Sequence, residues 1–167
     1  PGTVVSLVPD APVVDSAGVL DATQKQEILN QIQSLKQETG IGLYLVSLQS
    51  WQVLGQNHSN IEQFAVYLFN SNHLESRDLL VLFAMSEREC AIWRGNGYEQ
   101  GYDAWTEDLI NKTMIPSFKA GKYGEGLTMV ARRISKGMLL LSQGSSEVDR
   151  ILSGLSFPMD GAFAPEN

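Results

Sequence analysis

The sequence has little cysteine and little histidine. Cys90 is its single cysteine, which excludes a disulfide within the chain and leaves packing alone to hold the fold. The two histidines, His58 and His73, lie in polar, loop-like sequence, where a histidine metal site or a catalytic triad has little to draw on. We expect both histidines to be exposed. We expect Cys90, at the start of an apolar strand, to behave as a small apolar residue rather than a nucleophile.

Basic residues and long apolar runs are also scarce. Twelve Lys and Arg against nineteen Asp and Glu give a net charge of -7, which disfavours nucleic acid and anionic lipid as partners. The run GMLLLSQG near the end is far shorter than the roughly 20 residues of a membrane helix, so we expect no direct membrane insertion. The first residue, Pro1, follows no leader pattern, and we expect it to mark a processed or trimmed end.

The apolar residues that are present predict an α/β chain. Their spacing predicts helices within residues 20–40, 60–70, about 103–115 and about 123–141, and strands at 41–48, 78–84 and 90–94. Asp21 is expected to cap the first helix and Gly40 to follow its end. The short polar link between the last two strands predicts a hairpin, and hence a mixed sheet. This order favours a three-layer α/β/α sandwich around a small mixed sheet.

The domain organisation follows from the punctuation of the chain. With 167 residues, 43% of them hydrophobic, the chain can bury one sizeable core, and we expect a monomer. Prolines and weak periodicity make residues 1–11 an extended lead-in, and residues 12–143 form the domain. Residues 144–167, rich in Ser, Gly and Pro, form a tail. Among the aromatic residues, we expect Trp93 and Trp105 in the core and Trp51, in a polar loop, against a partner.

A glycine-rich stretch from 94 to 118, RGNGYEQGYDAWTEDLINKTMIPSF, raises the possibility of a phosphate cradle. It contains no Walker loop, and its G-x-G-x-x-x-G spacing is one residue longer than the dinucleotide fingerprint. Acidic side chains also stand where a pyrophosphate would bind. The stretch is better interpreted as a tight exit from a strand, with Asp103 capping the next helix and Pro116 stopping it.

Several of these segments together resemble the TPM domain family, over about residues 12–141. They are VVDSAGVLDATQKQEI, QETGIGLYLVSL, IEQFAVYLFN, LLVLFA, GNGYE and YDAWTEDLINKTMIPSFKAGKYGEGL. The resemblance implies an α/β/α sandwich on the extracytoplasmic side of a membrane, in the periplasm or a lumen, in a precursor that is often membrane-associated. Plant lumenal members are described as acid phosphatases with a divalent-cation site.

This chain departs from the family pattern at one important place. The family usually carries Asp-Asn-Gly just before the apolar strand, whereas this chain has Ser76, Arg77 and Asp78. There is also one residue fewer between Gly97 and Asp103 than in the pattern. Both departures put the acidic signature of the family in doubt.

Carboxylates near strand ends are the candidates for any chemistry that remains. Asp15, Glu75, Asp78 and Asp103 are candidate ligands for Ca²⁺ or Mg²⁺, and Asp103 and Asp78 are candidate catalytic residues. Each also has a structural interpretation: Asp15 as a turn or cap residue, Glu75 as a solvated loop charge. Asp78 would be a solvated strand-entry residue paired to an arginine, either Arg77 or Arg88.

Two functions of different classes stay open on this basis. The first is an extracytoplasmic domain for protein interaction or assembly, with an unidentified protein partner, a degenerate catalytic signature and no cofactor. The second is an acid phosphatase that acts on phosphate monoesters with the help of Ca²⁺ or Mg²⁺. The loss of Asp-Asn-Gly favours the first, because phosphoryl transfer depends on positioning and charge stabilisation.

Overall fold

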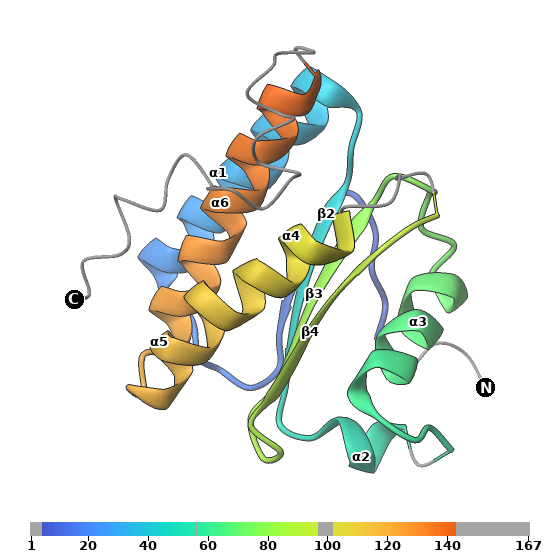
Figure 1. Cartoon of the computed structure of the whole chain (residues 1–167), viewed down its shortest axis with the longest axis vertical. Coiled ribbons are helices and arrows are strands. Elements are labelled where there is room, and N and C mark those ends of the chain that lie inside the picture. The colour runs from blue at the N-terminus through green and yellow to red at the C-terminus, as the bar shows by residue number, and fades with distance from the viewer. Residues whose placement is uncertain (1–4, 56, 97–101, 143–167) are drawn as a thin grey trace.

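A single mixed sheet organises the part of the chain that the computed structural model describes, residues 5–55, 57–96 and 102–142. Its strands are β1 (Val13–Asp15), β2 (Leu43–Leu48), β3 (Leu79–Ala84) and β4 (Glu89–Arg94), side by side in that order. The first three run parallel, and β4 returns antiparallel to β3 through a hairpin (Figure 1). The predicted mixed sheet and hairpin are therefore confirmed.

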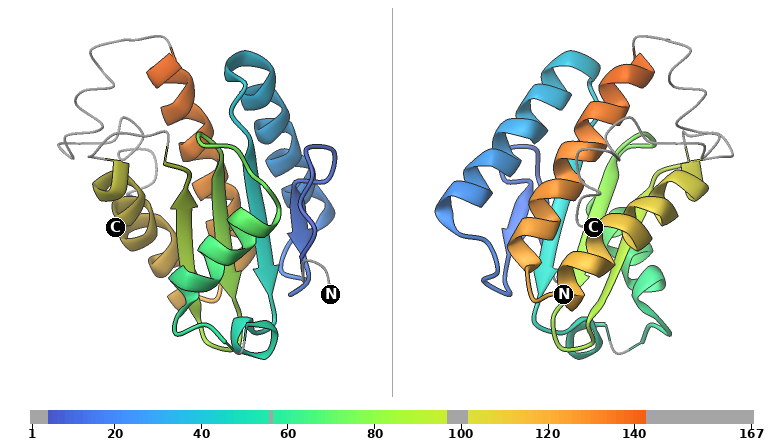
Figure 2. Two further views of the ribbon diagram at one scale, coloured as in Figure 1. Left: turned by 90° about the vertical axis from the view of Figure 1, so that its right-hand side faces the viewer. Right: turned by 60° about the vertical axis from the view of Figure 1, so that its left-hand side comes forward.

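Helices cover both faces of this sheet. They are α1 (Ala22–Thr39), α2 (Trp51–Leu54), α3 (Ile61–Ser71), α4 (Tyr102–Leu109), the π-helix η1 (Ile110–Met114), α5 (Ile115–Lys119) and α6 (Tyr123–Ser142). Figure 2 shows α1, α6 and the α4–α5 segment on one face and α3 on the other. Two apolar clusters follow this division, with alternate residues of each strand in each cluster. This is the predicted three-layer α/β/α arrangement. Within the described ranges, no helix combines the length and the apolar character that crossing a bilayer requires.

The first helix begins and ends where the sequence predicts. Asp21 accepts a hydrogen bond from the backbone N–H of Gln24, whose side chain accepts from the N–H of Asp21 in return. Gly40 ends the helix with a φ of 79°, a left-handed conformation that glycine adopts without a Cβ clash. Ile32 and Leu35 are among the buried residues of the inner face.

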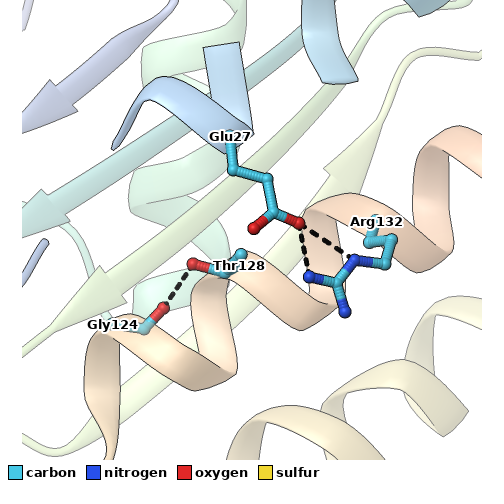
Figure 3. Close-up of polar contacts among 4 residues, drawn as sticks. All are labelled: Glu27, Gly124, Thr128 and Arg132. Atoms are coloured by element: carbon cyan, nitrogen blue, oxygen red, sulfur yellow. Dashed lines mark hydrogen bonds and ion pairs between the residues drawn. The ribbon is translucent and has the colours of Figure 1, made fainter. Parts of the chain in front are cut away.

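The two long helices α1 and α6 pack against each other and are joined by an ion pair at the surface. Arg132 of α6 donates from Nε and Nη2 to one carboxylate oxygen of Glu27 on α1 (Figure 3). The hydroxyl of Thr128 donates to the carbonyl of Gly124 one turn earlier, at 2.7 Å. A Cβ on Gly124 would lie 2.5 Å from the carbonyl oxygen of Val19, so this contact requires glycine.

The third predicted helix differs from its prediction, because Pro116 does not stop it. The π-helix η1 closes with an i to i−5 bond from the N–H of Ile115 to the carbonyl of Ile110, and α5 then continues to Lys119. Pro116 falls in the first turn of α5, where a missing N–H and a fixed φ are tolerated. The wider π-turn therefore makes room for the proline.

The lead-in packs on the sheet more closely than an extended segment would. Val5 and Leu7 are buried against the cluster that contains α3. Asn72 fastens them, since its side chain accepts from the N–H of Leu7 and donates to the carbonyl of Val5. The strand β1, which was not predicted from the sequence, follows after a short turn and pairs with the second half of β2.

The single turn α2 follows the end of β2 and contains Trp51. The position of Trp51 differs from its prediction. This side chain is only 3% exposed, so it cannot be the partner contact that its polar loop suggested. Its indole N–H donates to Glu89 at 2.7 Å, and its ring packs near Phe64. Glu87, in the hairpin turn, accepts from the hydroxyl of Ser50 at 2.5 Å and from the backbone N–H groups of Trp51 and Gln52.

These contacts generate a prediction for the pH dependence of stability. Partial burial raises the pKa of Glu87, but the hydrogen bonds from Ser50, Gln52 and Trp51 outweigh it, so the net pKa is lowered. A lowered folded-state pKa stabilises the fold above the ordinary glutamate value, and this contribution disappears as the pH falls through the lowered pKa. Glu87→Gln should therefore lose less stability than the wild type between pH 6 and pH 3. Urea unfolding at each pH measures this, and parallel losses in the two proteins would contradict it.

Candidate functional site

Asp78, the candidate at the start of β3, is buried rather than solvated. The residue is only 4% exposed. Oδ1 accepts from the backbone N–H of Gly42 and Oδ2 from that of Glu75, each at 2.8 Å. The predicted pairing to an arginine is wrong for Arg88, which lies in the hairpin turn at the far end of β3. Asp78 therefore joins the starts of two parallel strands through their backbones.

Both carboxylate oxygens of Asp78 already bind donors, which limits its chemistry. A metal ligand or nucleophile needs an accessible lone pair, and the burial of Asp78 leaves little of either oxygen accessible. A Cβ on Gly42 would lie 2.9 Å from Oδ1, so there is little space between the two groups. Glu75, in the same loop, is exposed, as the sequence analysis predicted.

Asp15 and Asp78 lie at opposite ends of the parallel strands: Asp15 is at the carboxyl end of β1, and Asp78 comes just before the start of β3. Asp15 pairs with Ser47 near the end of β2, whereas Asp78 contacts Gly42 just before the start of that strand. At about 3.3 Å per residue, the five steps from Gly42 to Ser47 separate the contact partners of the two carboxylates by roughly 16 Å along β2. The structure therefore does not bring Asp15 into one cluster with Asp78 and Glu75.

The contacts of Asp15 are those of a turn residue, one of its two structural interpretations, because the cap of α1 is Asp21. Its two oxygens accept from the N–H groups of Val19 and Leu20, each at 3.0 Å. The hydroxyl of Ser47 donates to Oδ1 at 2.5 Å and accepts from the N–H of Ala17. These bonds hold the turn that carries the chain from β1 to α1.

Asp103 lies near the same end of the strands as Asp78. Arg94, the last residue of β4, is opposite Leu79, so the chain leaves β4 beside the start of β3. α4 begins at Tyr102, which places Asp103 in the first turn of that helix. The side chain of Asp103 and the preceding residues 97–101 lie outside the described residues.

The fit of a divalent cation can be judged from the other three candidates. Asp15 lies at the other end of the strands, Asp78 accepts from backbone donors with both oxygens, and Glu75 is exposed. Across the residues that the structure describes, no group of three or more His, Cys, Asp or Glu side chains is placed to hold a metal ion. These three carboxylates therefore do not fit the cation site that the resemblance implies.

A groove of about 970 Å³ runs beside β4, and no motif in the sequence predicted it. Its floor is the outer side of β4, from Glu89 to Arg94. One wall is formed by α4, η1 and α5, which contribute Thr106, Glu107, Ile110, Asn111, Ile115, Phe118 and Lys119. The other wall begins at the first turn of α3, with Ile61 and Glu62. In Figure 2, β4 forms the margin of the sheet and α4 lies beyond it.

The groove contains Cys90, and its surroundings make that residue a poor nucleophile. Burial raises the pKa of the thiol to about 12, and the negative charges of Glu62 and Glu89 add to the effect. A thiol with this pKa is protonated at neutral pH and unreactive, as the sequence analysis expected. Sequence offers only one signal for the groove: β4 is less apolar than β2 and β3, as expected of a strand at a sheet margin.

The contacts of Asp78 generate a stability prediction. Asp78→Ala should lower the free energy of unfolding by about 2–4 kcal/mol, because two buried N–H groups lose their acceptor. Asp78→Asn keeps one acceptor oxygen and should cost about half as much. Glu75→Ala, which removes an exposed carboxylate from the same loop but keeps its backbone N–H, should change stability by no more than about 0.5 kcal/mol. Urea denaturation measures all three, and a silent Asp78→Ala would show that the carboxylate does not hold the loop.

Three solved structures share this fold. The N-terminal domain of a protein from P. gingivalis is 22% identical, with a TM-score of 0.64 over 76% of this chain and 82% of that one. The N-terminal domain of the cg2496 protein from Corynebacterium glutamicum is 17% identical, with a TM-score of 0.61 over 83% of each chain. The BA42 protein from the psychrophilic bacterium Bizionia argentinensis is 16% identical, with a TM-score of 0.57 over 74% and 83%. At these identities the likeness shows the fold alone.

Sequence comparison extends this likeness to a family. No curated protein matches the chain. The family model of the TPM domain matches residues 13–137, which run from the first residue of β1 into the last helix and include every strand of the sheet. This match covers well over half of the chain, so the protein belongs to the TPM domain family.

Proposed function

We propose that this TPM domain is an extracytoplasmic protein-interaction domain that binds its partner in the groove beside β4. One observation carries the proposal. The carboxylate of Asp78, in the segment where the family pattern has its acidic signature, is buried and holds Gly42 and Glu75 by their backbone N–H groups. A side chain used in this way supports the fold instead of chemistry.

The groove supplies what a protein-binding surface needs. Its α4–α5 wall presents half-buried apolar side chains, Ile110, Ile115 and Phe118, with the exposed polar Glu107 and Lys119 beside them. An apolar centre with a polar rim is the common arrangement of protein interfaces. The extracytoplasmic location is part of the proposal and rests on the family alone.

A phosphatase is the second candidate, and one observation favours it. The end of β4 lies beside the start of β3, so Asp103 is at the end of the sheet that also carries Asp78 and Glu75. Asp103 and Glu75 could then act at one site only if the segment before α4 directs the side chain of Asp103 to Glu75. The occupied oxygens of Asp78 weigh against this candidate.

An activity assay separates the two candidates. We expect hydrolysis of p-nitrophenyl phosphate by the purified domain to equal that by Asp103→Asn, at pH 5 and pH 7, with millimolar Mg²⁺, with Ca²⁺ and with chelator. An interaction domain has no group whose loss would slow the reaction. Turnover that requires a cation and falls at least tenfold in Asp103→Asn would establish the phosphatase instead.

Site-directed crosslinking tests the interaction directly. A photo-crosslinking residue at Asn111, which is exposed on the groove wall, should capture a discrete protein in the envelope or lumen fraction of the source cells. The same residue at Glu38, exposed on α1, is the control. Unlabelled domain should compete for the captured protein, whereas unlabelled Ile110→Lys, checked for folding by circular dichroism, should not. Equal capture from both positions would contradict a groove interface.

A further inference from the structure

The hydrogen-bond pattern of the sheet shows which backbone groups of β4 face outward. The N–H of Leu79 donates to Gly42 on the β2 side, so Leu79 and its partner Arg94 form a non-hydrogen-bonded pair. The next pair agrees, because the N–H of Gly95 donates to the carbonyl of Asp78. Since the two kinds of pair alternate in an antiparallel ladder, Ile92 and Cys90 also direct N–H and C=O away from β3. In the described structure, no strand pairs with β4 on that outer side.

The two sides of this edge differ in chemistry. On the side of α4 and α5, the groove presents Ile92, Ile110, Ile115 and Phe118, with the charged Arg94, Glu107 and Lys119 around them. On the side of α3, it presents Ile61, Ala91 and Trp93 with two exposed carboxylates, Glu62 and Glu89. The remaining charge, Arg88, lies in the hairpin turn at one end. The charged residues on the α3 side are therefore both acidic, and Glu89 lies at the hairpin end of β4.

We propose that the groove receives an extended segment of the partner as an additional strand on β4, with basic and apolar residues alternating along it. The apolar side chains would face α4 and α5, and the basic side chains would face Glu62 and Glu89. Alternate side chains of a strand point to opposite faces, so the two sides of the groove select alternate residues. The inference rests on the proposed interaction function and specifies its partner.

Charge and space both favour this partner. Glu62 and Glu89 act on the same short stretch of β4, since the negative charges of both raise the pKa of the Cys90 thiol. Basic side chains placed there would meet both carboxylates. A single strand needs only about 4.8 Å beside β4, whereas a second copy would have to bring its own flanking helices against α3 and α4. An extended segment therefore fits the groove better than the edge of another folded sheet does.

A synthetic peptide tests the strand directly. The probe is a blocked heptapeptide in which lysines alternate with valines, and NMR titration follows the backbone amides of Cys90 and Ile92. In a strand, all the valine N–H groups point to one edge and all the lysine N–H groups to the other. N-methylation of the valines alone, or of the lysines alone, therefore blocks one edge of the peptide. We expect one of these two peptides to lose binding and the other to keep it.

The retained peptide also gives the strand direction. Loss on valine methylation means antiparallel addition, and loss on lysine methylation means parallel addition, because residues opposite each other share a face. Equal effects of the two methylations, or no shift at Cys90 and Ile92 with the unmodified probe, would overturn the strand proposal.

Matched charge reversals test the basic residues. Glu62→Lys should weaken the unmodified probe by roughly threefold or more, in the range of exposed ion pairs. Glu38→Lys, which makes the same charge change on α1, should leave the affinity unchanged. Equal weakening by both variants would reduce the effect to net charge and overturn the basic pattern. If crosslinking from Asn111 succeeds while the peptides fail, the strand proposal is wrong and the interaction function stands. If neither succeeds, both fail.

Discussion

The complete burial of β3 is the constraint on which the rest of the structure depends. All of its residues from Leu79 to Ala84 are buried, with α1 and α6 over one face and α3 over the other. A buried strand must pair its backbone on both edges, which requires β2 on one side and β4 on the other. Asp78 extends this pairing beyond the strand, because its carboxylate reaches the backbone of Gly42 before β2 begins. The same burial that gives the sheet its core thus places a carboxylate where it must accept hydrogen bonds.

The direction of β4 decides what the molecule offers to its surroundings. Because β4 returns antiparallel, the chain leaves β4 beside Asp78, and the start of α4 lies near that end of the strands. The same return makes β4 the margin of the sheet and leaves the outer backbone groups of Cys90 and Ile92 facing a groove. An open margin is a liability in a monomer unless something covers it or a partner uses it. Here α3 and the α4–α5 segment flank the margin, so it can accept a single strand more readily than a sheet.

The sequence predicted the parts of this fold that depend on local patterns. Continuous apolar runs identified β2 and β3, and Asp21 and Gly40 marked the ends of α1. The candidate site was less accessible, because the donors to Asp78 include Gly42, 36 residues away in the chain. The prediction for Trp51 was wrong for the same reason. Its local sequence is polar, but it contacts Glu89 and Phe64, which are distant in the chain. β1 was missed because three residues are too few for a periodicity to show.

The π-helix connects the local anomaly of the chain to the groove. Pro116 cannot donate a helical hydrogen bond, and the i to i−5 closure from Ile115 to Ile110 inserts the extra residue that accommodates it. That insertion turns Thr113 and Met114 into the core and leaves Ile110 and Ile115 on the wall of the groove. Without the extra residue, a regular helix would present the residues that follow about 100° further round its axis. Different side chains would then face β4. Single π-turns occur frequently at functional sites, and sequences tend to break local rules where function demands it. The proline that looked like a stop signal therefore helps to set which side chains of this segment face the groove that we assign to the partner.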